Sequence, residues 1–194
     1  DDLLREAYIF AERELSKKIY IQKSFNFKDT LSIKIKIQCE YIYNKISEDY
    51  FSDKLIENCY EIALKNTCNS KIILSELHKK FKLAVVSNFY GNLKSVLSNF
   101  GLLEHLDLII ESAEIGISKP NPEIFQYAIN KLEITPRECI VIGDSYNKDI
   151  IPSKTLGCNT IWLKGKGWKD NPINHPCADE IIESINELKN ILDV

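Results

Sequence analysis

The sequence contains no methionine and only seven glycines among 194 residues. Its six cysteines form no Cys-x-x-Cys pair, so buried free thiols in a reducing compartment fit better than a zinc site or a disulfide framework. No apolar run is long enough to span a membrane, and no charged-then-apolar leader opens the chain. We therefore expect a cytoplasmic protein without a membrane partner. Because an initiator methionine is also missing, we expect the start of the chain to be cut or processed.

Concentrated positive charge is missing as well. The formal net charge is −3, and lysines and acids are mixed along the whole chain. Nucleic-acid-binding proteins usually carry a basic patch or stripe that follows the phosphate backbone, so nucleic acid is not the expected partner. The stretch GKGW, Gly165 to Trp168, lacks the full spacing of a phosphate-binding loop. We expect it to be an exposed loop.

The first part of the chain has the periodicity of helices. Apolar residues recur at helical spacing, as at Leu4, Ala7 and Ala11. The stretch LSIKIKI, Leu31 to Ile37, alternates as a strand would, yet it continues into apolar residues at helical spacing. We predict a helix there. Residues 1–78 are therefore predicted to form a helical domain.

The second part, residues 79–194, alternates strands with helices. Four short apolar runs are bounded by polar residues: LAVV (Leu83 to Val86), LDLII (Leu106 to Ile110), CIVI (Cys139 to Ile142) and TIWL (Thr160 to Leu163). Strands that are apolar almost throughout favour a parallel sheet covered on both faces. Helix signals include Asn121 as an N-cap before Pro122, a capped turn at Thr135 to Glu138, and a closing helix around Ile181 to Leu192. The predicted fold class is α/β, an open parallel Rossmann-like sheet with a helical cap domain.

Ligands of such sheets bind beyond the carboxyl ends of the strands, which draws attention to Ser87, Asn88, Glu111 and Asp144. Asp144 follows an apolar strand and a glycine, and a carboxylate held in that way suits Mg²⁺. Asp149 could orient a metal-bound water or pair with a lysine. The alternative is that Asp144 is a turn residue and Asp149 a solvated helix acid. This stretch alone gives the two interpretations equal weight.

Two further side chains shift that balance toward a phosphate site. Ser87 places a hydroxyl and the following backbone N–H groups at a strand end, where they could donate to a phosphoryl oxygen, although it could instead cap the next helix. Lys119 precedes a Pro-Asn-Pro sequence, so its ammonium extends from a stiff loop. A surface lysine before proline is ordinary. Between these two strand ends it is not, and we expect its removal to have little effect on stability.

Three stretches in the same order, VVSNF, SKPNPEIF and IGDSYNKDI, resemble the second, third and fourth motifs of the haloacid dehalogenase superfamily. This is a superfamily of aspartate-nucleophile phosphohydrolases, and the helical first part is similar to the cap of one of its branches. The resemblance covers about residues 81–165. It implies that Ser87, Asn88 and Lys119 bind the phosphoryl group. It also implies that Asp144 ligates Mg²⁺, and that Asp149, with Ser87 and Lys119, belongs to the catalytic set.

The sequence departs from the superfamily at its first motif, an apolar strand ending in Asp-x-Asp that carries the nucleophile. Asp1 and Asp2 follow no apolar strand, and Lys148 stands where the superfamily often has asparagine. The resemblance implies a Mg²⁺-dependent phosphatase that hydrolyses a small phosphorylated metabolite through an aspartyl-phosphate. Its nucleophile is expected upstream of residue 1, so this chain alone is expected to be inactive. The alternatives are a non-catalytic phosphate-binding or regulatory relative and a 2-haloacid dehalogenase, which would not need Asp144.

The missing first strand also affects the expected sheet. In the resembled fold it lies between the strand ending at Ser87 and the strand ending near Asp144. Without it those strands would lie about 10 Å apart, two spacings of ~4.8 Å, with both facing edges unpaired. We therefore expect that the two strands do not pair directly and that the chain does not fold stably by itself.

Overall fold

The computed structural model describes residues 2–17, 20–42, 49–165 and 176–194. It divides into two units, each described here by itself. We call them the helical unit (Asp1–Lys71 and Tyr90–Glu104) and the α/β unit (Ile72–Phe89 and His105–Val194). The predicted fold class, α/β with a parallel Rossmann-like core and a helical domain, is confirmed. The functional division into a cap of residues 1–78 and a core of residues 79–194 stays a prediction.

The helical unit contains α1 (Asp2–Lys17), α2 (Phe27–Ile42), most of α3 (Asp49–His78) and α4 (Leu93–Asn99). α1 packs against α2 in this unit. The helix predicted over LSIKIKI is confirmed as part of α2. At its start, the N–H of Asn26 donates to Asp29 Oδ2 and the N–H of Asp29 donates to Asn26 Oδ1, both at 3.0 Å. This reciprocal cap satisfies donors that every helix start leaves open, and so it favours a helix over a strand.

Five strands form two parallel sheets in the described part of the α/β unit. In one sheet β1 (Ala84–Ser87) pairs with β2 (Leu108–Glu111). In the other, β4 (Asn159–Leu163) lies between β3 (Ile140–Gly143) and β5 (Glu180–Ile182). The four predicted strands are thus confirmed, with small shifts at their ends. As expected, β1 and β3 do not pair with each other within the described residues.

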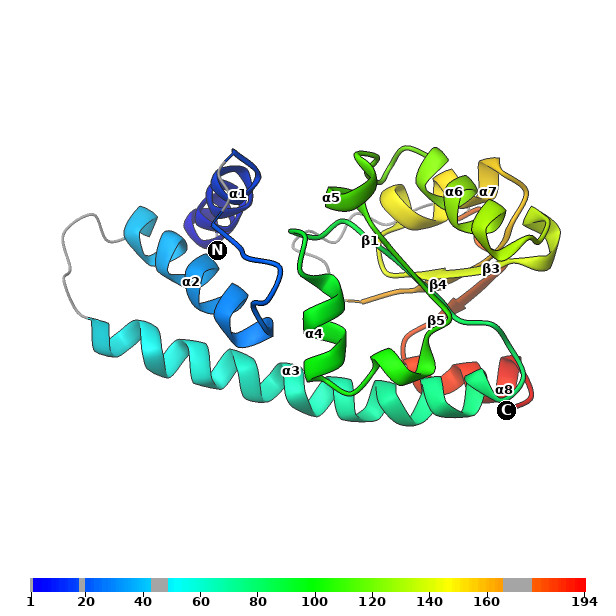
Figure 1. Ribbon diagram of the computed structural model, residues 1–194, viewed down its shortest axis with the longest axis horizontal. Helices are drawn as coiled ribbons and strands as arrows, with labels where there is room; N and C mark the ends of the chain where they lie inside the picture. The colour runs from blue at the N-terminus through cyan, green and yellow to red at the C-terminus, as the bar shows by residue number, and fades with distance from the viewer. Residues whose placement is uncertain (1, 18–19, 43–48, 166–175) are drawn as a thin grey trace. The chain divides into compact units, whose positions relative to one another are not determined.

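The remaining elements of the α/β unit are mostly short (Figure 1). They are α5 (Ser112–Ile115), α6 (Glu123–Leu132), α7 (Ile151–Thr155), α8 (Leu188–Ile191), the 3-10 turns η2 (Pro136–Glu138) and η4 (Ile185–Glu187), and the π-helical turn η3 (Tyr146–Ile150). Another 3-10 turn, η1 (Leu103–His105), spans the boundary between the units. The capped turn predicted at Thr135 is confirmed by its capping box with Glu138. Asn121 Oδ1 accepts from the N–H of Glu123 at 3.0 Å, although Pro122 occupies the N-cap position itself.

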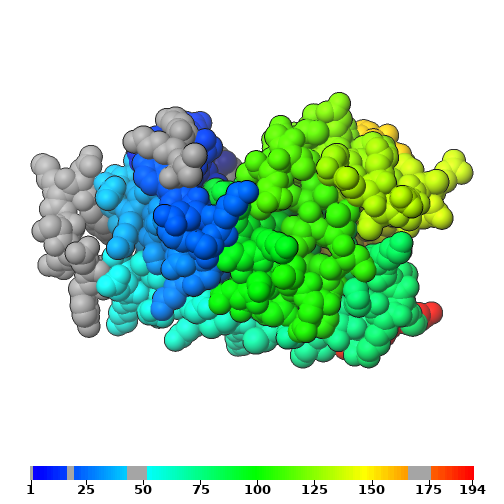
Figure 2. Space-filling view, viewed as in Figure 1, coloured from blue at the N-terminus to red at the C-terminus, as the bar shows by residue number. Residues whose placement is uncertain are grey.

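Two apolar clusters stabilise the α/β unit. One joins β2 to α6 through Ile110, Ile124, Phe125 and Ala128. The other joins the end of α3 to β4, β5 and α8 through Ile73, Leu77, Ile161, Ile182 and Leu188. Each of the larger buried side chains contributes roughly 1.5–3 kcal/mol by leaving water. α6 also contributes to the surface seen in Figure 2. Its Tyr127 lies on the side opposite the cluster and is 37% exposed.

The predicted closing helix over Ile181 to Leu192 is wrong in its first part. Ile181 and Ile182 belong to β5, and the helix is limited to Leu188–Ile191. Ile182 is 1% exposed, because pairing with β4 places it in the second cluster. A short apolar pair carries no local signal that separates a strand from a helix. Within the described residues, no helix combines the length and the apolar character that crossing a membrane would require.

Candidate active site

The ends of β1 and β3 present two polar side chains. Ser87 is the last residue of β1, and among the described residues its hydroxyl has no hydrogen-bond partner. Asp144 follows β3 directly, is exposed, and likewise has a carboxylate with no partner in the described part of the chain. Its backbone is held, because Trp162 Nε1 donates to the carbonyl oxygen of Asp144 at 3.1 Å. Both side chains are therefore available to a ligand from fixed positions.

Asn88 connects the end of β1 to the loop that carries Lys119. Its side-chain Nδ2 donates to the carbonyl oxygen of Lys119 at 2.9 Å, and its Oδ1 accepts from the N–H of Lys119 at 2.8 Å. The Lys119–Pro120 peptide bond is cis. Asn88, predicted to bind substrate, thus has its side-chain amide engaged with the main chain of Lys119. Its observed contacts are those of a residue that positions the lysine.

Lys119 forms an ion pair with the buried Asp149. Lys119 Nζ lies 2.6 Å from Asp149 Oδ1, and the two side chains are 16% and 6% exposed. The other carboxylate oxygen, Oδ2, accepts from the N–H of Ser145 at 3.0 Å, while the N–H of Asp149 donates to the carbonyl oxygen of Ser145 at 2.7 Å. A buried carboxylate needs such partners, because removing an unpaired charge from water is costly. Of the two roles considered for Asp149, lysine pairing is the one observed.

Gly143 allows this arrangement. A Cβ atom at this position would lie 2.3 Å from Asp149 Cβ and 2.7 Å from its Cγ, far inside normal contact distance. The Asp149 side chain therefore lies directly against the main chain at Gly143. Glycine fits at position 143 because a side chain there would overlap the Asp149 side chain.

Asp149 is also held through its main chain. It lies in the π-helical turn η3, and Ser153 Oγ, which is fully buried, donates to the Asp149 carbonyl oxygen at 2.5 Å. π-helical turns occur frequently at functional sites. Residues from three separate stretches of sequence, Asn88, Lys119 and Asp149, are thereby joined into one hydrogen-bonded series.

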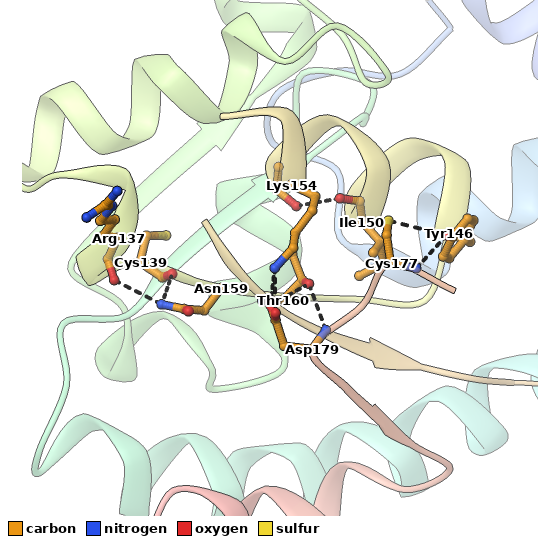
Figure 3. Close-up of polar contacts among 10 residues, drawn as sticks. Arg137, Cys139, Tyr146, Ile150, Lys154, Asn159, Thr160, Cys177 and Asp179 are labelled. Atoms are coloured by element: carbon orange, nitrogen blue, oxygen red, sulfur yellow. Dashed lines mark hydrogen bonds and ion pairs between the residues drawn. The ribbon is translucent and has the colours of Figure 1, made fainter. Parts of the chain in front are cut away.

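A second polar cluster holds α7, the helix that follows η3, against the sheet (Figure 3). Lys154 Nζ lies 2.6 Å from Asp179 Oδ2, which also accepts from Thr160 N at 2.7 Å and Thr160 Oγ1 at 3.0 Å. The hydrogen bond from Lys154 is the main cause that lowers the pKa of Asp179, and the Thr160 bonds add to it. No sequence motif marks these three residues. Their connection exists only because β4 and β5 are neighbours.

The donor set fits a magnesium ion at Asp144. Mg²⁺ takes one or two protein carboxylates and completes its coordination with water and phosphate oxygens. Asp144 supplies one exposed carboxylate that pairs with no cation of the described residues, whereas Asp149 is already paired with Lys119. Within the described residues, no three His, Cys, Asp or Glu side chains gather closely enough to hold a metal by themselves. The stretch GKGW lies almost wholly outside the described residues, apart from Gly165.

Comparison with known proteins gives consistent matches. A family model described as haloacid dehalogenase-like hydrolase matches residues 8–163. The mouse haloacid dehalogenase-like hydrolase domain-containing protein 3 is 34% identical over 114 residues, which are 58% of this chain and 45% of the mouse protein. The glyceraldehyde 3-phosphate phosphatase of Methanocaldococcus jannaschii is 36% identical over 97 residues, 50% of this chain and 42% of that protein.

A solved structure of a dehalogenase with an intermediate complex aligns with a TM-score of 0.65 and 19% identity, covering 97% of this chain and 81% of the other. At that identity the likeness shows the fold alone. The matched part of this chain covers less than half the length of each of these two curated relatives.

Proposed function

We propose, from the premise that the chain belongs to the haloacid dehalogenase-like hydrolase family, that it forms part of a Mg²⁺-dependent phosphatase. Its substrate would be a small phosphorylated metabolite, and its location the cytoplasm. Relatives named as phosphatases support this choice. The observation that carries the proposal is the series Asn88–Lys119–Asp149, which fixes an ammonium group between the end of β1 and the end of β3.

In this proposal each residue has a role that fits its position or its contacts. The Ser87 hydroxyl and the backbone N–H groups that follow it donate to phosphoryl oxygens. Lys119 balances the negative charge of the phosphoryl group, and Asn88 and Asp149 hold its main chain and its ammonium in place. Asp144 would hold the metal ion, which when bound neutralises phosphoryl charge and orients the group for attack.

The nucleophile in this proposal comes from a further apolar strand that ends in Asp-x-Asp and lies between β1 and β3. Both strands pair on one side only within the described residues. In β3, moreover, Ile140 and Ile142 are 39% and 37% exposed. Apolar edge strands of this kind pair readily with another strand. The first aspartate of the proposed Asp-x-Asp motif would attack phosphorus and give an aspartyl-phosphate, which water then hydrolyses.

Substitution of Asp144 provides the test of the metal site. In the native protein that contains this chain, Asp144→Asn should weaken Mg²⁺ binding by at least about tenfold, because losing even an outer-shell partner costs roughly 10–100-fold. The fold should be retained, since the side chain is exposed. Calorimetric titration with Mg²⁺ gives the affinity, and Asp53→Asn, at an exposed position of α3, serves as the matched control. Unchanged Mg²⁺ affinity would remove Asp144 from the site.

Turnover separates the proposed activity from its alternatives. Mg²⁺-dependent release of phosphate from an aryl phosphate by the native protein supports the phosphatase. Halide release from a 2-haloacid that persists in Asp144→Asn would indicate a dehalogenase. Binding of inorganic phosphate without either reaction would indicate a non-catalytic phosphate-binding protein.

A further inference from the structure

Two cysteines lie side by side where β3 and β4 begin. All six cysteines are free thiols, but only Cys158 is fully buried, while Cys139 is half-buried. β3 and β4 pair in parallel with Ile140 opposite Asn159, so the preceding residues, Cys139 and Cys158, are opposite each other. The N–H of Asn159 donates to the Cys139 carbonyl oxygen at 3.0 Å, which extends the ladder to this point.

This placement suits a covalent bond between the sulfur atoms. Neighbouring strands lie about 4.7–4.9 Å apart, and disulfide-linked residues have Cα atoms roughly 4.4–6.8 Å apart. Residues opposite each other in a ladder direct their side chains to the same face of the sheet. The Asn159 side chain fixes the start of the ladder further, donating to the carbonyl oxygens of Arg137 at 2.9 Å and Cys139 at 3.4 Å (Figure 3).

The two thiols also interact with each other and are not equivalent. A hydrogen bond from Cys158 lowers the pKa of the Cys139 thiol. The same bond, together with burial, raises the pKa of the Cys158 thiol. Cys139 is therefore the better nucleophile of the two and the more accessible one.

We propose that Cys139 and Cys158 are an oxidation site at which hydrogen peroxide oxidises the two thiols to a reversible intramolecular disulfide. The Cys139 sulfur attacks the peroxide, so an S–O bond forms, the O–O bond breaks and water leaves. The Cys158 sulfur then attacks the resulting sulfenic acid, so the S–S bond forms, the S–O bond breaks and a second water leaves. Two thiols lose two electrons in total, and hydrogen peroxide accepts them with the two thiol protons.

The bond would close the segment between Cys139 and Cys158, which contains Asp144 and Asp149. It forms at the amino ends of β3 and β4, whereas Asp144 follows the carboxyl end of β3. The disulfide therefore restrains the segment without contacting the acids. Because a cross-link restricts the unfolded chain, oxidation should raise the thermal midpoint of unfolding, and dithiothreitol should reverse the increase.

Peptide mapping tests the proposal on the native protein that contains this chain. The exposed thiols are removed first as Cys68→Ser and Cys177→Ser, to prevent cross-links between molecules. After hydrogen peroxide treatment and alkylation in denaturant, we expect a peptide pair linked by Cys139 and Cys158. Dithiothreitol should reduce this link and separate the two peptides. Cys39 and Cys59 in the helical unit should stay reduced during the peroxide treatment, so that both are then alkylated and serve as internal controls.

Single substitutions then test the order of events. In Cys158→Ser the linked peptide should disappear, and Cys139 should accumulate as a sulfenic acid that reacts with dimedone. In Cys139→Ser neither product should form. The proposal is overturned if Cys139 and Cys158 stay reduced at peroxide concentrations that oxidise Cys68 in the unsubstituted chain. Linkage of Cys139 to a different cysteine would overturn it equally.

Discussion

At the residue scale, the ion pair between Lys119 and Asp149 changes what is expected of the lysine. From sequence, Lys119 could be removed with little effect on stability. The structure shows that its ammonium is the charge partner of a carboxylate that is only 6% exposed. Removing one member of a buried pair leaves the other charge uncompensated, which is more costly than losing both.

We therefore predict that Lys119→Ala destabilises the native protein by on the order of 3 kcal/mol. Denaturant unfolding monitored by circular dichroism measures this change. The double variant Lys119→Ala, Asp149→Asn should recover part of the loss, because no charge is then left buried. Lys131→Ala, on the surface of α6, should have almost no effect and is the matched control. Equal stability of Lys119→Ala and the parent would show that the pair contributes nothing.

The same substitution should lower turnover of an aryl phosphate by about 10²–10³-fold, the usual effect of losing one group that stabilises transition-state charge. Turnover is measured on the fraction that remains folded, so the two effects are separable. A variant with near-normal turnover would return Lys119 to the role of an ordinary lysine in a structural ion pair.

Gly143 leads to a second prediction at this scale. In Gly143→Ala the new methyl group would overlap Asp149 Cβ, so Asp149 must move and its bonds to Lys119 and Ser145 must weaken. Overpacking of this kind costs roughly 1–3 kcal/mol. Gly165→Ala is the matched control, because no atom of the described residues lies within 4 Å of a Cβ placed there. If both alanine variants unfold at the same denaturant concentration, the close approach at Gly143 has no energetic consequence.

At the scale of elements, α7 is tied to the sheet by Lys154, Thr160 and Asp179. The hydrogen bond from Lys154 lowers the folded-state pKa of Asp179 below its unfolded value. A carboxyl group with a lowered folded pKa stabilises the fold above its unfolded pKa, near 3.9, and loses this contribution as pH falls through the folded value. The effect is modest because the Asp179 side chain is 44% exposed and water screens it.

We predict that Asp179→Asn reduces stability at pH 7 by up to about 1 kcal/mol. The difference from the parent should shrink as the pH falls below about 4, where the parent carboxylate also takes up a proton. Urea unfolding of both proteins at several pH values checks this. A difference that stays constant from pH 7 to pH 3 would mean that the charge of Asp179 is not what stabilises α7.

At the scale of the whole molecule, the described residues of the α/β unit form two sheets, where one continuous sheet would leave fewer open edges. Unpaired strand edges expose backbone donors and acceptors that a further strand would satisfy. Each such group costs roughly 1–3 kcal/mol if it is buried without a partner.

We predict that a segment with an apolar strand ending in Asp-x-Asp joins β1 and β3 in the native protein. Hydrogen exchange should then be slow in both strands. This chain prepared alone should exchange fast there and be less stable, and slow exchange in the isolated chain would contradict the prediction.

The local sequence by itself determined most elements and the candidate residues. Helical spacing and the Asn26–Asp29 cap specify α2, and four short apolar runs specify four strands. The positions of Ser87, Lys119 and Asp144 beside strands or rigid turns indicate a candidate site. These signals are local because capping, periodicity and turn formation act over only a few residues.

Tertiary structure alone decided which residues meet. Ile181 and Ile182 form part of strand β5 because pairing with β4 supplies backbone hydrogen bonds and burial. Asn88 binds the main chain of Lys119 across 31 positions of sequence, and Lys119 binds Asp149 across 30. Such contacts depend on how the strands are ordered in the fold, which no short stretch of sequence encodes. Glycine is needed at position 143 because the Asp149 side chain lies where a Cβ atom would be, and this contact depends on the tertiary structure.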